Sequence, residues 1–214
     1  MKTNKLSIGI IDLKINNIFS IYKAMELAGF NTNIVGSNES LKKYKLIVLP
    51  GVGSYKMSMR SIKKSNLDRK LKEYIQNDDN KLFGICLGMQ LFFDNSSEFG
   101  NTPGLGLLKG NVKKFDLKKT NYIPHMNWNN IKFSGLNQNK ITKRLNQKYF
   151  YFVHSFYCDP ENDKNILTTS RFNKQEFCSS ILSKNILGTQ FHPEKSGKTG
   201  IDFLRNINNF YENN

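Results

Sequence analysis

Residues Lys81–Phe93 read KLFGICLGMQLFF. Within this run Cys86 stands between Gly84 and Gly88, after one apolar segment and before a second with helical character. The order is typical of a strand–nucleophile–helix turn, here with a thiol, in which the sharp turn lifts the side chain out of the sheet. Glycine is expected on both sides of such a cysteine, because the backbone at a nucleophile is strained and the substrate must approach it closely. The following helix would point its positive end at the sulfur and favour the thiolate.

A single cysteine between a strand and a helix also has a simpler interpretation, which is a buried packing residue. A nucleophile would need a base and a group that orients the base. His192 ends an apolar run that is stopped by Pro193, and Glu194 follows on the same side of an extended chain. This spacing lets Glu194 hold the imidazole in one tautomer, as in a catalytic triad. Taken alone, the segment could equally be a histidine at a strand end beside a surface glutamate.

An acyl-transfer site also needs N–H donors for the developing oxyanion. The sequence offers the N–H of Leu87, next to the cysteine, and the turn PGVG at 50–53, with Gly51 and Val52 as its donors. The glycines of this turn would let a peptide swing its N–H toward the site. Gln90 lies one helical turn after the cysteine, where it could bond a polar substrate or face solvent. We recognise neither a metal site nor a phosphate-binding loop and predict no metal and no cofactor.

Strands and helices alternate along the first half of the chain. Apolar runs at 6–12, 31–35 and 46–49, and the run leading into Cys86, are typical of buried strands. We predict a basic helix over 56–72, whose lysines form a solvated face or a patch for a phosphorylated or acidic partner. Such alternation favours a parallel sheet covered by helices. Ligands of these sheets bind at the carboxyl ends of strands, where the cysteine and the PGVG turn both lie.

From Gly104 onward the pattern changes to short β-like segments separated by turns. They are 112–115, 131–133, 149–154, 166–170, 178–182 and 186–191, and an amphipathic helix follows at 199–211. We expect a more antiparallel half packed on the same sheet, and we see no linker or repeat. The predicted fold is therefore α/β, a central mostly parallel sheet flanked by helices with an antiparallel C-terminal half, in a single domain over 1–214.

The composition limits the possible functions. The chain has 214 residues and a formal net charge of +15. Its lysines are spread along the chain, without zinc-finger spacing or an RNA-binding aromatic signature, so we predict no nucleic-acid partner. Three cysteines without disulfide spacing predict a reducing, intracellular compartment. No apolar run is long enough for a signal peptide or a membrane span, so we expect a cytoplasmic protein that does not associate with membranes.

Several segments together resemble the class I, or triad, glutamine amidotransferases. They are GICLGMQ at 84–90, PGVG at 50–53 and QFHPEKS at 190–196. Two further segments, PHMNWN at 124–129 and YFVHSF at 151–156, resemble the glutaminase subunit of imidazole glycerol phosphate synthase. The resemblance covers essentially the whole chain and implies the class I amidotransferase fold.

The resemblance implies hydrolysis of L-glutamine to glutamate and ammonia. Cys86 would attack the side-chain amide and form a glutamyl thioester, His192 would move the protons, and Glu194 would orient His192. The ammonia would pass through a channel into a (β/α)8-barrel cyclase, the partner in a heterodimer. This cyclase makes imidazole glycerol phosphate and an aminoimidazole carboxamide ribotide in histidine biosynthesis, and its ligand activates the glutaminase. Bound glutamine would lie near Gly53, Gln90, Ser155 and Phe156, and the partner near Asn17, Trp128 and Lys195.

The chain departs from this family in three places. After the first strand the family has Asp-Tyr-Gly-x-Gly-Asn, whereas residues 12–17 read DLKINN, so a loop that relied on glycine must take another shape. Asn127 replaces the family's glycine before tryptophan, and Phe156 replaces its tyrosine after His-Ser. These segments are expected near the partner, so a cyclase-like partner that aminates a sugar in surface-polysaccharide biosynthesis stays open. The intact triad argues against a non-catalytic binding subunit, and the glutamine-pocket segments argue against another cysteine hydrolase.

Overall fold

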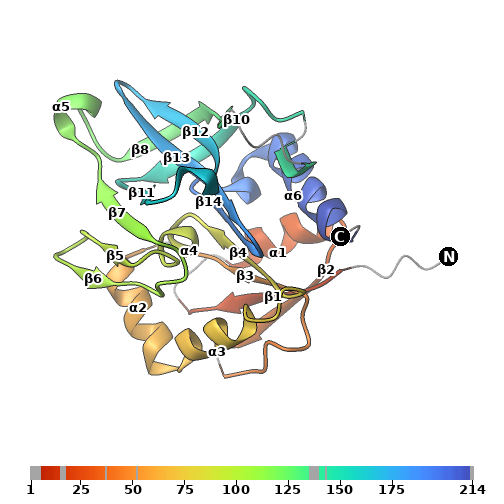
Figure 1. Ribbon diagram of the computed structural model, residues 1–214. Helices are drawn as coiled ribbons and strands as arrows, with labels where there is room; N and C mark the ends of the chain where they lie inside the picture. The colour runs from red at the N-terminus through yellow and green to blue at the C-terminus, as the bar shows by residue number, and fades with distance from the viewer. Residues whose placement is uncertain are drawn as a thin grey trace.

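The computed structural model describes residues 6–14, 18–36, 38–51, 53–134, 140–142 and 144–212. A twisted sheet runs through both halves of the chain and has helices on either side (Figure 1). The N-terminal elements are β1 (Ser7–Asp12), α1 (Ile18–Leu27), β2 (Asn31–Gly36), β3 (Leu46–Leu49), α2 (Tyr55–Lys64), α3 (Leu67–Tyr74), β4 (Lys81–Ile85) and α4 (Leu87–Gln90). The C-terminal elements are β5 (Asn95–Ser96), β6 (Thr102–Pro103), β7 (Gly110–Lys114), α5 (Leu117–Thr120), β8 (His125–Asn130), β9 (Lys132–Phe133), η1 (Lys140–Thr142), β10 (Tyr149–His154), β11 (Phe156–Pro160), η2 (Asp163–Asn165), β12 (Ile166–Phe172), β13 (Gln175–Ser183), β14 (Ile186–Thr189), η3 (Pro193–Lys195) and α6 (Gly197–Glu212).

Alternate residues of the parallel strands pack on opposite faces of the sheet. Ile10 and Val48 belong to the core cluster that includes residues of α1 and α6. Their neighbours Ile11 and Ile47 belong to the cluster that includes residues of α2 and α3. This is the side-chain period of a strand, and burial on both faces explains why these strands read as continuous apolar runs. The sheet is therefore the middle of three layers.

The sheet changes from parallel to antiparallel at β14. This strand is parallel to β4 on one side and antiparallel to β13 on the other. The main path of the sheet is β2-β1-β3-β4-β14-β13-β11-β7-β5-β6. Off this path, β12 pairs with β13 and β9 pairs with β12, while β8 and β10 pair in a separate small sheet. The predicted fold class is confirmed, and the antiparallel half continues the central sheet edge to edge.

The basic segment that was predicted as one helix is two. α2 ends at Lys64 and α3 begins at Leu67, because Asn66 between them has a φ of 54°, in the left-handed region. The apolar spacing continues across this break, since Ile62 and Leu71 are both buried. The apolar segment after Cys86, which was predicted to be helical as far as Phe93, is helical only in part, because α4 ends at Gln90.

The loop at 12–17 is described only as far as Lys14. This residue takes the position of the family's first glycine and has a φ of 61°. Its N–H donates to Asp12 Oδ1 over 2.8 Å, and its ammonium lies 2.6 Å from Asp12 Oδ2. A backbone conformation that glycine adopts freely is thus present at a residue with a Cβ, which costs about 1 kcal/mol. Asn17, predicted to face a partner, lies outside the described residues.

Among the described residues, no helix has the length and apolar character needed to cross a bilayer.

Candidate active site

Cys86 occupies the sharp turn between β4 and α4. Its φ of 54° and ψ of −107° lie outside the conformations that residues with a side chain normally adopt. The turn is fixed on both sides, since the Cys86 N–H donates to the Thr189 carbonyl over 2.6 Å and the Gln90 N–H donates to the Cys86 carbonyl over 3.1 Å. Strain of this kind persists only where the surrounding structure imposes it, and it is common at functional sites.

The two glycines beside the cysteine allow close packing. A Cβ on Gly88 would lie 1.8 Å from the carbonyl oxygen of Leu49, and a Cβ on Gly84 would lie 2.5 Å from the ring of Phe92. Neither glycine has a positive φ, which belongs to the cysteine itself. The predicted strain is therefore present at the cysteine, but packing of α4 against the ends of β3 and β4 is what requires the glycines.

His192 and Glu194 form a buried pair immediately after β14. Nδ1 of His192 lies 2.7 Å from Oε1 of Glu194, and the two side chains are 1% and 4% exposed. The backbone of His192 is fixed as well, because its N–H donates to the Tyr151 carbonyl over 2.9 Å and its carbonyl accepts from Ser196 Oγ over 2.7 Å. The carboxylate of Glu194 accepts a hydrogen bond from His192 Nδ1, so Nδ1 carries a proton. The other ring nitrogen, Nε2, points away from Glu194.

The charges around His192 favour its protonated form. Burial lowers the pKa of an imidazole, but the sulfur of Cys86 and the carboxylate of Glu194 outweigh burial and raise the pKa of His192 to about 10. Nε2 of His192 is buried and has no hydrogen-bond partner among the described residues. A cationic imidazole beside the thiol with an available N–H can stabilise a thiolate and later donate a proton.

Gln190 contacts the sulfur directly, a role that the sequence analysis did not assign. This residue is fully buried, and its Nε2 donates to Cys86 Sγ over 3.5 Å. Its Oε1 accepts from Gln90 Nε2 over 3.1 Å, and the same Gln90 nitrogen donates to the carbonyl of Phe156 over 2.9 Å. The only sequence signal was a polar residue ending an otherwise apolar strand.

A cavity of about 730 Å³ opens over the cysteine. Two predicted site residues do not line this cavity. Glu194 lies behind His192. Gly51 packs against α4, where an added Cβ would lie 2.5 Å from the Gly88 nitrogen. Val52, predicted as an oxyanion donor, lies outside the part of the chain that the structure describes. The predicted residues that line the cavity are Gly53, Cys86, Leu87, Gln90, Ser155, Phe156, His192 and Lys195.

The profile of the glutamine amidotransferase class-I family matches residues 9–209, which is nearly the whole chain. The chain belongs to this family. Two curated relatives of this amidotransferase cover almost all of its length. Subunit HisH 2 of imidazole glycerol phosphate synthase from Methanococcus maripaludis is 41% identical over 94% of this chain and 98% of its own. Subunit hisH of the same synthase from Cyanidium caldarium is 38% identical over 96% of this chain and 99% of its own length.

Solved structures agree with this family at the level of the fold. The structure of PurLQS from Thermotoga maritima matches the amidotransferase chain with a TM-score of 0.76 at 22% identity, over 96% of this chain and 99% of the other. A crystal structure of a glutamine amidotransferase matches with a TM-score of 0.70 at 16% identity, over 93% of this chain and 97% of the other. These structures confirm the predicted fold class. The family profile and the curated relatives confirm the family and the prediction that the chain is a glutamine amidotransferase.

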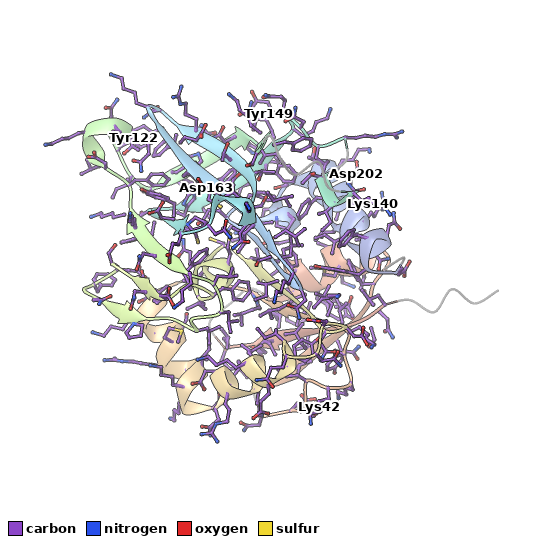
Figure 2. The ribbon with its side chains drawn as sticks, viewed as in Figure 1. Lys42, Tyr122, Lys140, Tyr149, Asp163 and Asp202 are labelled. Atoms are coloured by element: carbon purple, nitrogen blue, oxygen red, sulfur yellow. The ribbon has the colours of Figure 1, made fainter. Side chains whose placement is uncertain are left out.

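The small β8–β10 sheet gives the amidotransferase an exposed apolar face. Met126 and Trp128 on β8 are 61% and 48% exposed, and Tyr149 on β10 is 57% exposed. Tyr149 lies at the periphery of the molecule (Figure 2). Lys195, which was predicted to face a partner together with Trp128, is exposed, and its Nζ lies 5.9 Å from the ring centre of Tyr151 on β10.

Glu98 lines the cavity and was not predicted. One carboxylate oxygen, Oε2, accepts from the backbone N–H of Tyr55 over 2.6 Å, at the start of α2. Lys114 also lines the cavity, so its wall contains groups of both charges. The sequence gives no signal for Glu98, because its position depends on the pairing of β5 with β7, and β5 is too short to show an apolar pattern.

Proposed function

We propose that this amidotransferase hydrolyses L-glutamine to glutamate and ammonia, with Cys86 as nucleophile, His192 as acid and base, and Glu194 as the group that orients His192. The observation that carries the proposal is the buried arrangement of a strained thiol and a histidine with an unpartnered Nε2 in one cavity wall. The 2.7 Å contact with Glu194 supports the orienting role.

The thiolate of Cys86 attacks the side-chain amide carbon of glutamine. The carbonyl π electrons move to oxygen, which N–H groups stabilise, and we assign this role to the backbone at Leu87 and at the turn over 50–53, of which Leu87 and Gly53 line the cavity. When the C–N bond breaks, the His192 N–H gives its proton to the departing nitrogen, which leaves as ammonia. The neutral imidazole then takes a proton from water, whose oxygen attacks the thioester. Cleavage of the C–S bond releases glutamate and regenerates the thiolate beside protonated His192.

The cavity suits an amino acid as substrate. Glutamine carries an α-ammonium and an α-carboxylate, and Glu98 and Lys114 offer opposite charges in the cavity wall. Gly53, Gln90, Ser155 and Phe156 supply backbone and side-chain polar groups near these charges; we propose that they bind the rest of the substrate.

We further propose that the ammonia passes to a (β/α)8-barrel cyclase subunit in a heterodimer, for imidazole glycerol phosphate formation in histidine biosynthesis. Relatives that are subunits of imidazole glycerol phosphate synthase, about 40% identical over nearly the whole chain, support this acceptor. The partner would dock near Trp128 and Lys195. The replacements at Asn127 and Phe156 keep a second acceptor under consideration, a sugar that a cyclase-like partner aminates.

The test is Cys86→Ala in the complex with the cyclase subunit of the same organism. We expect glutamine-dependent formation of imidazole glycerol phosphate to fall below detection, while added ammonium salts still support it, because only the nucleophile is lost. Loss of both activities would contradict a dedicated supplier of ammonia. If the complex consumes glutamine but forms no imidazole glycerol phosphate, the histidine acceptor is wrong and sugar nucleotides become the substrates to test.

A further inference from the structure

His125 and His154 form a buried pair that the proposed mechanism does not use, and His154 lines the cavity. Nδ1 of His125 lies 3.1 Å from Nε2 of His154, and the residues are 2% and 6% exposed. The ring of His125 is stacked between Phe152 and Phe172, with ring centres 5.1 and 4.5 Å away. Burial lowers the pKa of His125 to about 4, and burial together with His125 lowers the pKa of His154 to about 3. Both rings are therefore neutral near pH 7.

The partners of the two rings decide which nitrogens carry protons. The Phe156 carbonyl can only accept, so His154 Nδ1 carries the proton and donates over 2.8 Å. His154 Nε2 must then accept, and the donor is His125 Nδ1. His125 Nε2 accepts in turn from Asn129 Nδ2 over 3.3 Å, and that amide also donates to the Arg171 carbonyl over 2.8 Å. The three hydrogen bonds made by the two rings therefore run in one direction, from Asn129 through His125 and His154 to the carbonyl of Phe156.

The same carbonyl belongs to the chain of contacts that reaches the thiol. Its second hydrogen bond comes from Gln90 Nε2 over 2.9 Å, and Gln90 Nε2 also contacts Gln190 Oε1 over 3.1 Å. Gln190 Nε2 donates to Cys86 Sγ over 3.5 Å. His154 and Gln90 thus share one acceptor, and both line the cavity with Phe156. The position of the carbonyl determines where the Gln90 amide lies.

We propose that His154, with its tautomer fixed by His125, is a positioning residue for glutamine binding. It holds the Phe156 carbonyl, and through it the Gln90 amide, at the cavity wall. The inference rests on the proposed glutaminase function and adds two residues to it. Without the His154 donor, the half-buried Phe156 carbonyl would keep only the Gln90 donor, and the segment carrying it would move to find another partner. Binding of glutamine should then weaken, whereas the intrinsic reactivity of the thiol should not.

The experiment compares two reagents on the full-length chain. 6-Diazo-5-oxo-L-norleucine, a glutamine analogue, alkylates Cys86 after binding in the pocket, whereas iodoacetamide reports thiol reactivity alone; both are quantified on the Cys86 peptide by mass spectrometry. In His154→Leu, which removes the donor, we expect the half-saturating concentration of the diazoketone to rise about tenfold. The iodoacetamide rate should stay within about twofold. These values correspond to the loss of about one hydrogen bond in binding.

Two further variants separate positioning from packing. His154→Asn places an amide N–H where Nδ1–H lies, and we expect half-saturation within about threefold of the unchanged chain. His125→Leu should give an intermediate rise, because it acts only through His154. Asn185→Leu is the matched control, since Asn185 is 5% exposed and donates to the Ile75 and Asn80 carbonyls, away from the cavity. It should lower stability and leave half-saturation unchanged.

Equal effects of His154→Asn and His154→Leu would overturn the proposal, because ring packing would then explain them. An unchanged half-saturating concentration of the diazoketone in His154→Leu would also overturn it. A parallel fall in the alkylation rates of the diazoketone and of iodoacetamide would do the same. Should the unchanged chain react with iodoacetamide at Cys86 but never with the diazoketone, the proposed glutaminase function fails and this inference with it.

Discussion

At the scale of single residues, Glu194 determines how firmly His192 keeps its proton. Because this carboxylate helps to raise the pKa of His192, Glu194→Gln should lower that pKa while its amide oxygen still accepts from Nδ1. We expect the titration midpoint of His192, followed by NMR of the labelled imidazole, to fall by at least about one pH unit. Glutamine turnover should then decline at a pH about one unit lower than in the unchanged chain, because the imidazole is protonated at pH 7 in both proteins but loses its proton earlier in the variant as the pH rises.

Asp163→Asn provides the control for this titration. Asp163 is an exposed carboxylate on η2, labelled in Figure 2, and its replacement should leave the His192 midpoint unchanged. An unchanged midpoint in Glu194→Gln as well would show that the 2.7 Å contact does not couple the two groups.

The contact of His192 with Glu194 and the sharp turn at Cys86 could be predicted from the sequence because both are local. His192 and Glu194 are two residues apart, and Cys86 lies in a turn that its glycine neighbours mark. Gln190 and Glu98 escaped prediction for the opposite reason. Their roles depend on which residues of other elements they meet, Gln90 in one case and Tyr55 in the other, and no local spacing encodes these contacts.

Lys14 allows a test of backbone strain at one residue. Lys14→Gly and Lys14→Ala both remove the ion pair with Asp12, which is worth little because the lysine side chain is 85% exposed. Only glycine relieves the φ of 61°. We expect the glycine variant to be more stable than the alanine variant by about 1 kcal/mol in urea unfolding. Equal stabilities would mean that this conformation imposes no cost.

At the scale of elements, α4 depends on its approach to β3. Gly88→Ala would place a Cβ 1.8 Å from the backbone oxygen of Leu49, which cannot move without disturbing the sheet. We expect a loss of at least about 3 kcal/mol in the free energy of unfolding, together with slower alkylation of Cys86. Gly36→Ala is the control, because a Cβ at this position would contact only the flexible side chain of Glu39, at 3.4 Å. Similar stabilities of the two variants would contradict this packing argument.

Other elements show why a sequence predicts element types better than their ends. The apolar period continues through Asn66, so nothing in the pattern marked the break between α2 and α3. β8 was not predicted as a strand because Met126 and Trp128 are exposed and three asparagines interrupt any alternation. Its pairing with β10, from Asn130 opposite Tyr149 to His125 opposite His154, is a contact between distant parts of the chain.

At the scale of the whole molecule, the exposed face of β8 and β10 is where we propose that a partner docks. Trp128 is 48% exposed and contacts only the ring of Tyr151, 6.2 Å away between centres, among the aromatic contacts described for it. Large aromatic residues are the side chains that most often dominate binding energy. We therefore expect Trp128→Ala to weaken the complex with the cyclase subunit at least about tenfold, measured by titration calorimetry.

The same variant should leave the isolated chain intact, because an exposed side chain contributes little to the core. Its free energy of unfolding should change by less than about 0.5 kcal/mol, and the diazoketone should still alkylate Cys86. Met57→Ala on α2 is the control, as Met57 is 62% exposed and lies outside the β8–β10 face. If both variants bind the cyclase as tightly as the unchanged chain, the partner docks elsewhere.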